Sequence, residues 1–244
     1  MPAIYKPKGA AQEYSKYACN LYVGCSNKCE YCYCKQIMRG IWSDVPTLKK
    51  CLKNEYKAFE IFNRELIKNK TELQEYGLFF TFSSDSMLTE TIDLNLQAIE
   101  LCLQNNIPVI ILTKKTDWTE LFFYATTFFY NCQSQYKSLL KIGFTLTGCD
   151  ELEPFANINQ ERIEAMQFLK AKGFYTWASI EPIIDFKKSY EMIEKTIDFC
   201  DEYKIGLKSG ARPNRYELIA FVESVKAITK DKKVLFKNSI KKYL

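Results

Sequence analysis

The sequence contains no histidine. This absence excludes histidine-based metal sites, Ser-His-Asp catalytic triads and acid–base catalysis by an imidazole. Any proton transfer that the protein carries out must therefore use Glu, Asp, Lys, Tyr or Cys side chains.

The sequence also lacks long apolar runs. No segment approaches eighteen consecutive apolar residues, so no transmembrane helix is predicted. Residues 1–14 lack the charged and then apolar pattern of a secretory signal. We therefore expect a cytoplasmic protein without membrane association, whose ten cysteines are reduced or metal-bound. The formal net charge of +5 tolerates an anionic partner but does not require nucleic acid.

Short apolar runs alternate with amphipathic segments from about residue 15 onward. Strands are predicted at residues 18–23, 78–82, 109–113, 141–147, 175–180 and 205–208. Helices are predicted at residues 48–69, 92–103, 118–135, 159–172, 190–200 and 216–230. Strict alternation of this kind favours a parallel sheet with right-handed crossovers.

Six strand–helix units do not close an eight-stranded barrel. The predicted fold class is therefore α/β, a partial (β/α)6 TIM-type barrel with a parallel sheet. We expect a single domain over residues 1–244, with its core at residues 17–230 and the tail from residue 234 at one end. Ligands of parallel α/β proteins lie outside the carboxyl ends of the strands, so residues directly after strands are the first candidates for chemistry.

Three cysteines follow the first predicted strand. Cys25, Cys29 and Cys32 have the spacing Cys-x3-Cys-x2-Cys. Three thiolates at this spacing can bind three corners of one [4Fe–4S] cluster and leave the fourth iron without a protein ligand. The alternative is a zinc-stabilised binding module without catalysis, in which Cys34 is the fourth ligand.

The other cysteines form no second closely spaced set, so an auxiliary cluster is not expected. Cys102 and Cys200 lie on apolar faces of predicted helices and are expected in the core. Cys149 follows the fourth strand, where a small loop residue is favoured over a hydrogen-atom donor.

The cysteine motif, with Tyr31 before its last cysteine, resembles the signature of the radical S-adenosylmethionine (SAM) superfamily. The resemblance implies that Cys25, Cys29 and Cys32 bind the [4Fe–4S] cluster. It implies that the fourth iron is chelated by the methionine part of SAM and that the Tyr31 backbone reads adenine. A 5′-deoxyadenosyl radical then abstracts hydrogen from the substrate, and the electron comes from a donor such as flavodoxin or ferredoxin.

The later motifs resemble the spore-photoproduct-lyase-like branch of that superfamily, over residues 17–185. They are Ser83-Ser84-Asp85, Leu112-Thr113-Lys114, Thr145-Leu146-Thr147-Gly148, Arg162 and Glu181-Pro182.

The resemblance to this branch implies roles in binding SAM for several of these residues. Ser84 and Asp85 face the methionine amino group, and Lys114 or Arg162 pairs with its carboxylate. Thr145 or Thr147 bonds a ribose hydroxyl. For each of these residues an ordinary role stays open: Asp85 as a helix cap, Lys114 as a solvated side chain, and Arg162 in an ion pair.

The substrate is expected to be a small molecule rather than DNA. The chain is shorter than photoproduct lyases, has no cysteine at residues 77–82 to match their hydrogen donor, and has no added basic hairpin. A photoproduct-lyase-like DNA repair enzyme is therefore the alternative. The short form of this branch also resembles the queuine lyases, which implies a radical SAM lyase that converts queuine to a 7-deazaguanine base.

Aromatic and acidic side chains near the predicted site suit such a base. Tyr22, Tyr33, Trp42 and Trp177 are placed to stack on a nucleobase, although core packing is an equally good explanation. Glu181 can accept two N–H groups from a guanine-type edge or can be a structural ion-pair partner. Together with Lys114, it is the candidate for proton transfer.

Overall fold

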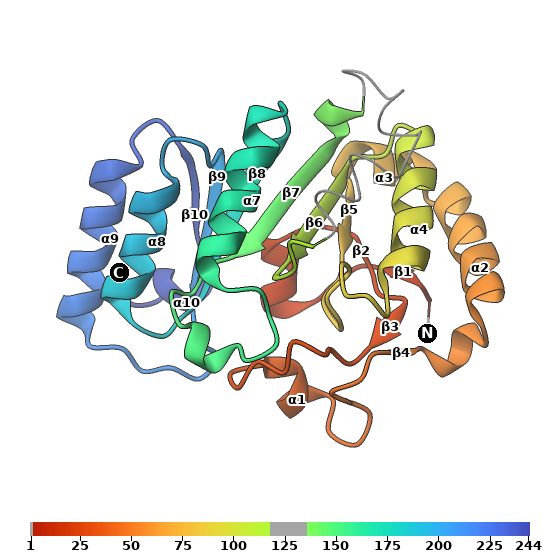
Figure 1. The fold of residues 1–244 in the computed structure, drawn as a ribbon, viewed down its shortest axis with the longest axis horizontal. Coiled ribbons are helices and arrows are strands. Elements are labelled where there is room, and N and C mark those ends of the chain that lie inside the picture. Colours follow the sequence, from red (N-terminus) through yellow and green to blue (C-terminus); the bar gives the residue numbers. More distant parts are fainter. Residues whose placement is uncertain (1, 118–135) are drawn as a thin grey trace.

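The structure is a computed structural model that describes residues 2–117 and 136–244, and one sheet runs through it (Figure 1). The eight strands lie in the order β1-β2-β5-β6-β7-β8-β9-β10. Their bounds are β1 (Ile4–Tyr5), β2 (Ala18–Cys19), β5 (Leu78–Phe80), β6 (Val109–Thr113), β7 (Leu140–Thr145), β8 (Tyr175–Ile183), β9 (Glu202–Leu207) and β10 (Lys233–Phe236). Only β1 pairs antiparallel with its neighbour, so the sheet is mostly parallel.

Helices connect the parallel strands. Between β2 and β6 lie α1 (Tyr33–Ile37), α2 (Glu55–Lys68), α3 (Lys70–Tyr76) and α4 (Ile92–Gln104). After β7 follow α7 (Asn159–Ala171), α8 (Phe186–Thr196), α9 (Arg215–Ile228) and α10 (Asn238–Lys241). Helix α8 packs against both α7 and α9, and α2 packs against α4 (Figure 1). Four short 3-10 helices complete the described chain: η1 (Gly9–Glu13), η2 (Lys50–Leu52), η3 (Lys137–Leu139) and η4 (Asp150–Leu152).

The α/β class and the parallel sheet predicted from the sequence are confirmed. The first predicted strand is instead two short strands, β2 and β3 (Tyr22–Val23), and β3 pairs with β4 (Thr47–Leu48). The predicted tail contains β10, which adds a seventh parallel strand at the open edge of the sheet. The predicted helix at 118–135 lies outside the described residues.

Two helix boundaries follow from local chemistry. Helix α2 begins at Glu55 rather than at residue 48, because the Asn54 side chain caps it by accepting a hydrogen bond from Lys57 N at 2.9 Å. Helix α7 ends before Gly173, whose φ of +84° supplies the left-handed turn that stops a helix.

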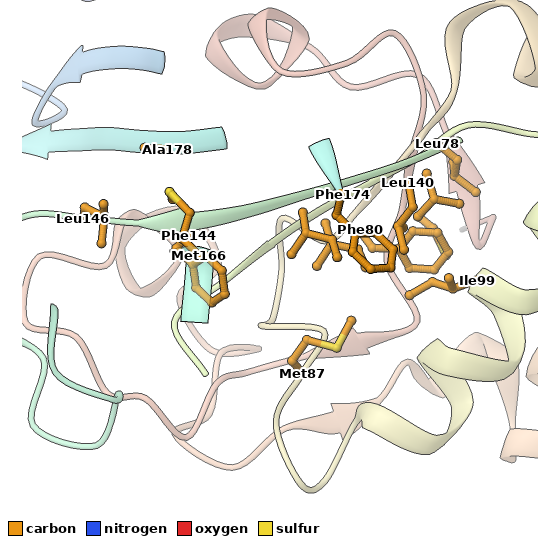
Figure 2. Close-up of a cluster of buried hydrophobic side chains, with 14 of the residues drawn as sticks. Leu78, Phe80, Met87, Ile99, Leu140, Phe144, Leu146, Met166, Phe174 and Ala178 are labelled. Carbon is orange, nitrogen blue, oxygen red and sulfur yellow. The ribbon is translucent and has the colours of Figure 1, made fainter. Parts of the chain in front are cut away.

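The main core fills the space between the sheet and the helices. Figure 2 shows Leu78, Phe80 and Phe144 from the strands near Ile99 of α4 and Met166 of α7. Cys102 and Cys200 are both fully buried in this core, as predicted. Because side chains alternate along a strand, Phe79 points to the other side of the sheet from Phe80. There it packs with Ala18 and Trp177 in a second, smaller cluster.

Trp177 depends on the absence of a side chain at Gly143, its register partner on β7. A Cβ added at Gly143 would lie 2.1 Å from the indole. The indole Nε1 donates to the carbonyl of Ile111 at 3.1 Å, which satisfies its buried polar atom. No helix in the described ranges combines the length and apolar character needed to cross a membrane.

This close contact yields the first prediction. Gly143→Ala should lower the free energy of unfolding by about 1–3 kcal/mol, because overpacking forces side-chain and backbone shifts. Urea unfolding of the single variants and of Gly143→Ala combined with Trp177→Leu measures the coupling. The double variant should lose less stability than the sum of the two single changes. Strict additivity would show that Gly143 and Trp177 do not share this space.

Candidate active site

A cavity of about 540 Å³ opens at the carboxyl ends of the strands. Its lining includes the three cysteines of the Cys-x3-Cys-x2-Cys motif, Cys25, Cys29 and Cys32. Ser84 in the turn after β5, Lys114 directly after β6 and Pro182 near the end of β8 line it as well. The structure therefore brings the cysteine motif and several predicted site residues to one cavity.

Backbone hydrogen bonds hold the cysteine loop at both ends. Gly24 N donates to Ser83 O at 3.0 Å, and Glu30 N donates to Leu152 O at 3.0 Å. Gly24 has a φ of +100°, and a Cβ there would lie 2.5 Å from Ser43 O, so only glycine fits directly before Cys25.

The cysteine sulfurs have different electrostatic surroundings. Burial raises the pKa of Cys25 to about 12 and also raises the pKa of Cys29. The hydrogen bond with the Cys34 thiol lowers the pKa of Cys32 to about 6. The single Cys34 proton has a second acceptor within reach, the Phe82 carbonyl at 3.2 Å. Cys25 and Cys32 each interact electrostatically with Cys29, as expected for thiols that face one site.

Asp85 is a buried carboxylate with four protein donors around it. It accepts from Asn27 Nδ2 in the cysteine loop at 2.9 Å and from Met87 N at 3.0 Å. It also accepts from the Thr113 hydroxyl at 2.6 Å and from Lys114 N at 2.9 Å, both at the end of β6. Asp85 does not cap α4, which begins after Thr91. It lines the cavity, and its contacts join the cysteine loop to the ends of β5 and β6.

A second buried chain joins Tyr31 to the end of β7. The Tyr31 hydroxyl donates to Glu153, and Arg162 Nη2 lies 2.5 Å from the other Glu153 oxygen. Arg162 Nη1 donates to Thr145 O at 2.8 Å. Burial, followed by the charge of Glu153, raises the pKa of Tyr31 well above its ordinary value.

The structure corrects the prediction for Arg162 as a partner of the SAM carboxylate. Its side chain is fully buried, its guanidinium is engaged by Glu153 and two carbonyls, and it is not among the described residues that line the cavity. The open alternative of an ion pair is the one observed, although the pair is buried rather than at the surface.

Lys114, Ser84 and Thr145 all line the cavity, as the predicted roles in binding SAM require. The Lys114 ammonium lies 5.5 Å from the centre of the Tyr31 ring. Burial lowers the pKa of Lys114, but the charges of Cys29 and Glu153 outweigh this effect and leave the pKa raised. A cation is thus held beside the cysteine loop.

The four predicted aromatic residues divide into two pairs. Tyr33 and Trp42 line the cavity, and the buried Nε1 of Trp42 has no hydrogen-bond partner among the described residues. Tyr22 instead donates its hydroxyl to Glu55 at 2.6 Å, and Trp177 is fully buried against Gly143. Neither Tyr22 nor Trp177 is among the described lining residues, so the prediction that they contact substrate is wrong for this geometry.

Glu181 lines the cavity but is already paired. Lys237 Nζ lies 2.9 and 2.6 Å from its two oxygens, and the Tyr14 hydroxyl donates to it. Burial and the Glu181 charge raise the pKa of Tyr14 well above its ordinary value. Both Glu181 oxygens thus have protein donors, which leaves the carboxylate less available to a guanine-type edge than predicted.

The donor set also bears on the kind of metal that the site can hold. Among the described residues, no three Cys, Asp or Glu side chains are placed to bind a single metal ion. A mononuclear zinc site needs its sulfurs only about 4 Å apart, because each lies at ~2.3 Å from one ion. The described side chains thus form no ready mononuclear site, such as the zinc-stabilised module needs. A cubane cluster would instead bind each thiolate through a different iron.

Several residues of the site were not predicted. Glu153, Tyr14 and Lys237 lie in segments without a motif, and only the fold brings them to the site. Asn27 was open to prediction, since it lies inside the cysteine motif and an amide there can reach a neighbouring carboxylate.

Comparisons with known proteins agree with the fold. No protein-family model matches the chain. The uncharacterized protein MJ0683 of Methanocaldococcus jannaschii is 25% identical, over 94% of this chain and 83% of that protein.

Two crystal structures of SuiB from Streptococcus suis are also similar. One, bound to S-adenosylmethionine, has a TM-score of 0.55 at 12% identity over 87% of this chain and 49% of SuiB. The other has a TM-score of 0.56 at 11% identity over 87% and 48%. The chain thus spans about half the length of SuiB, and the likeness is one of fold.

The buried ion pair yields the second prediction. Arg162→Met should cost about 3–5 kcal/mol of unfolding free energy, because it leaves the Glu153 charge buried without its partner. Lys226→Met is the matched control, since Lys226 pairs with Glu223 at the surface and such pairs contribute only about 0–1 kcal/mol. Urea unfolding measures both variants. Equal, small losses would rule out the buried pair as a structural support.

Proposed function

We propose that the protein is a radical SAM enzyme in which Cys25, Cys29 and Cys32 bind a [4Fe–4S] cluster and SAM occupies the adjoining cavity. The observation that carries the proposal is that all three cysteines line one cavity at the carboxyl ends of parallel strands. The fold likeness to SuiB, one of whose structures is bound to SAM, supports it. When bound and reduced, the cluster supplies the electron that cleaves SAM to a 5′-deoxyadenosyl radical.

The residues of the chain position these groups. The contacts of Glu153 with Tyr31 and of Asp85 with Asn27 fix the cysteine loop. Lys114, rather than Arg162, is the cation available to the SAM carboxylate, because it lines the cavity beside the loop. Ser84 binds the SAM amino group and Thr145 binds a ribose hydroxyl in this proposal, since both residues line the cavity. An electron donor such as flavodoxin or ferredoxin completes the system.

For the reaction, we propose a lyase that acts on a small modified nucleobase, with queuine converted to a 7-deazaguanine base. The cavity volume of about 540 Å³ is in the range of ligand sites. Trp42 offers an aromatic face for stacking and an indole N–H without a partner among the described residues. Glu181, which Lys237 and Tyr14 hold in place, and Lys114 exchange protons with the substrate in this proposal, and both line the cavity.

The third prediction tests the cluster. Cys29→Ser, purified without oxygen, should lose the roughly four irons per chain and the brown colour of the cluster, and should form no 5′-deoxyadenosine. Cys51→Ser is the matched control, since Cys51 is exposed and not among the described lining residues. Iron analysis and chromatography of SAM products measure the outcome. Unchanged SAM cleavage by Cys29→Ser would refute the assignment.

The fourth prediction tests the substrate. The reduced protein, incubated with SAM and queuine, should release a smaller deazaguanine that mass spectrometry detects. Trp42→Leu should raise the KM for queuine about tenfold through lost stacking, which is worth ~1–3 kcal/mol per base. The variant should keep SAM cleavage. SAM cleavage without any queuine turnover in the wild type would discard this substrate and keep the enzyme class.

A further inference from the structure

The cavity carries an excess of positive charge. Seven lysines line it, Lys8, Lys28, Lys35, Lys114, Lys208, Lys237 and Lys242, against two carboxylates, Asp85 and Glu181. Both carboxylates are occupied by protein donors, Asp85 by four and Glu181 by Lys237 and Tyr14. A ligand in this cavity therefore meets a net positive field.

Five of these lysines have no ion-pair partner among the described residues; Lys28 belongs to the cysteine loop and Lys114 lies beside it, whereas the other three lie elsewhere. Lys8 precedes η1, Lys208 follows β9 and Lys242 follows α10. Within the described residues, no carboxylate lies within ion-pair distance of Lys8, Lys208 or Lys242. All three are exposed and are among the residues that line the cavity, and the Lys242 ammonium lies 4.9 Å from the centre of the Tyr243 ring.

Hydrogen bonds hold the three segments against one another. Leu207 N donates to the Ser239 hydroxyl at 3.0 Å, which joins the end of β9 to α10. The Tyr243 hydroxyl donates to Ala211 O at 3.2 Å, which fixes the loop after β9. Asn238 N donates to Glu13 at 2.6 Å, which joins α10 to η1. Lys8, Lys208 and Lys242 therefore lie on segments that hydrogen bonds hold together: the start of η1, the loop after β9, and the end of α10. We call these segments one wall of the cavity.

The loop after β9 adds backbone donors to this wall. Ala211 N closes a turn onto Lys208 O at 3.0 Å, whereas the N–H groups of Ser209 and Gly210 meet no acceptor among the described residues. Gly210 has a φ of +78°, with open space where a Cβ would lie. Successive free N–H groups in such a turn form an anion-binding concavity, and loops after the late strands of α/β barrels frequently bind phosphate.

SAM does not account for this wall. It is a sulfonium cation without a phosphate group, and its only anionic group is the carboxylate that Lys114 is placed to meet beside the cysteine loop. Three ammonium groups and two amides exceed what one carboxylate needs, but they match the charge and the three oxygens of a phosphomonoester. The cations are confined to a cavity wall, which suits a small molecule better than a polynucleotide backbone.

We propose that Lys8, Lys208, Lys242 and the amides of Ser209 and Gly210 bind the phosphate of a small phosphomonoester substrate. The enzyme of the proposed function then accepts the nucleobase as its nucleoside 5′-monophosphate in addition to the free base. The identity of the base rests on the proposed function, whereas the phosphate site rests on the wall alone.

Equilibrium binding of guanosine 5′-monophosphate and of guanosine to the purified holoprotein tests the proposal. The monophosphate should bind at least tenfold more tightly, and inorganic phosphate should compete with it. Lys208→Ala combined with Lys242→Ala should weaken monophosphate binding by roughly tenfold or more, as expected for lost charge-assisted contacts. Guanosine binding should not change. Lys230→Ala, an exposed lysine that is not among the described lining residues, is the matched control.

Equal affinity for the two probes, or equal monophosphate binding by the double variant and the control, would overturn the phosphate site. Tighter binding of a single-stranded oligonucleotide than of the monophosphate, weakened by the same double variant, would replace it with a nucleic-acid site. SAM cleavage by the wild type is measured in parallel. If cleavage persists while the phosphate site fails, the proposed function stands; if cleavage is absent while the probes are distinguished, only the phosphate site stands.

Discussion

The Asp85 carboxylate is the contact on which the geometry of the site depends. It receives donors from the cysteine loop, from the turn after β5 and from the end of β6. A buried carboxylate is tolerated only when its oxygens accept hydrogen bonds. The cysteine loop, the turn after β5 and the end of β6 are therefore held in the one arrangement that brings all four donors to Asp85. Glu153, which accepts hydrogen bonds from Tyr31 and Arg162, likewise positions the cysteine loop relative to the end of β7, where Arg162 donates to Thr145 O. The cysteine motif is thus held by charge from two directions.

Much of the fold could be predicted from the sequence, because parallel strands and amphipathic helices leave strong periodic patterns. The strand at Val109–Thr113 and the helix ending at Gly173 both agree closely with the structure. The first strand was predicted too long, since β2 and β3 belong to different sheets and an apolar run does not reveal its partners. Strand β10 was not predicted because its apolar run is only three residues long, Val234 to Phe236, and its pairing with β9 is a long-range contact.

The candidate site was predicted less completely than the fold. Ser84, Lys114, Thr145 and Glu181, which the motifs on and after the predicted strands indicated, all line the cavity. It could not show that Glu181 is neutralised by Lys237, because that lysine lies 56 positions away along the chain. Arg162 has the charge that a SAM carboxylate needs, but burial against Glu153 takes it out of reach. The charge of a residue and its place in the sequence thus indicate candidates for ligand binding. Whether such a residue is free to contact a ligand depends on the ion pairs that it forms with distant residues in the folded protein.

The cavity draws on residues from both ends of the described chain. Lys8 and Tyr14 line it together with Lys237 and Lys242. Asn238 N also donates a hydrogen bond to Glu13, which lies 225 positions earlier in the sequence. Contacts between such distant residues raise the contact order of the fold, which slows folding. The part of the cavity that they supply is in place only when both ends of the described chain have docked. Before that, the sulfurs of Cys25, Cys29 and Cys32 are open to solvent on the side that these ends cover.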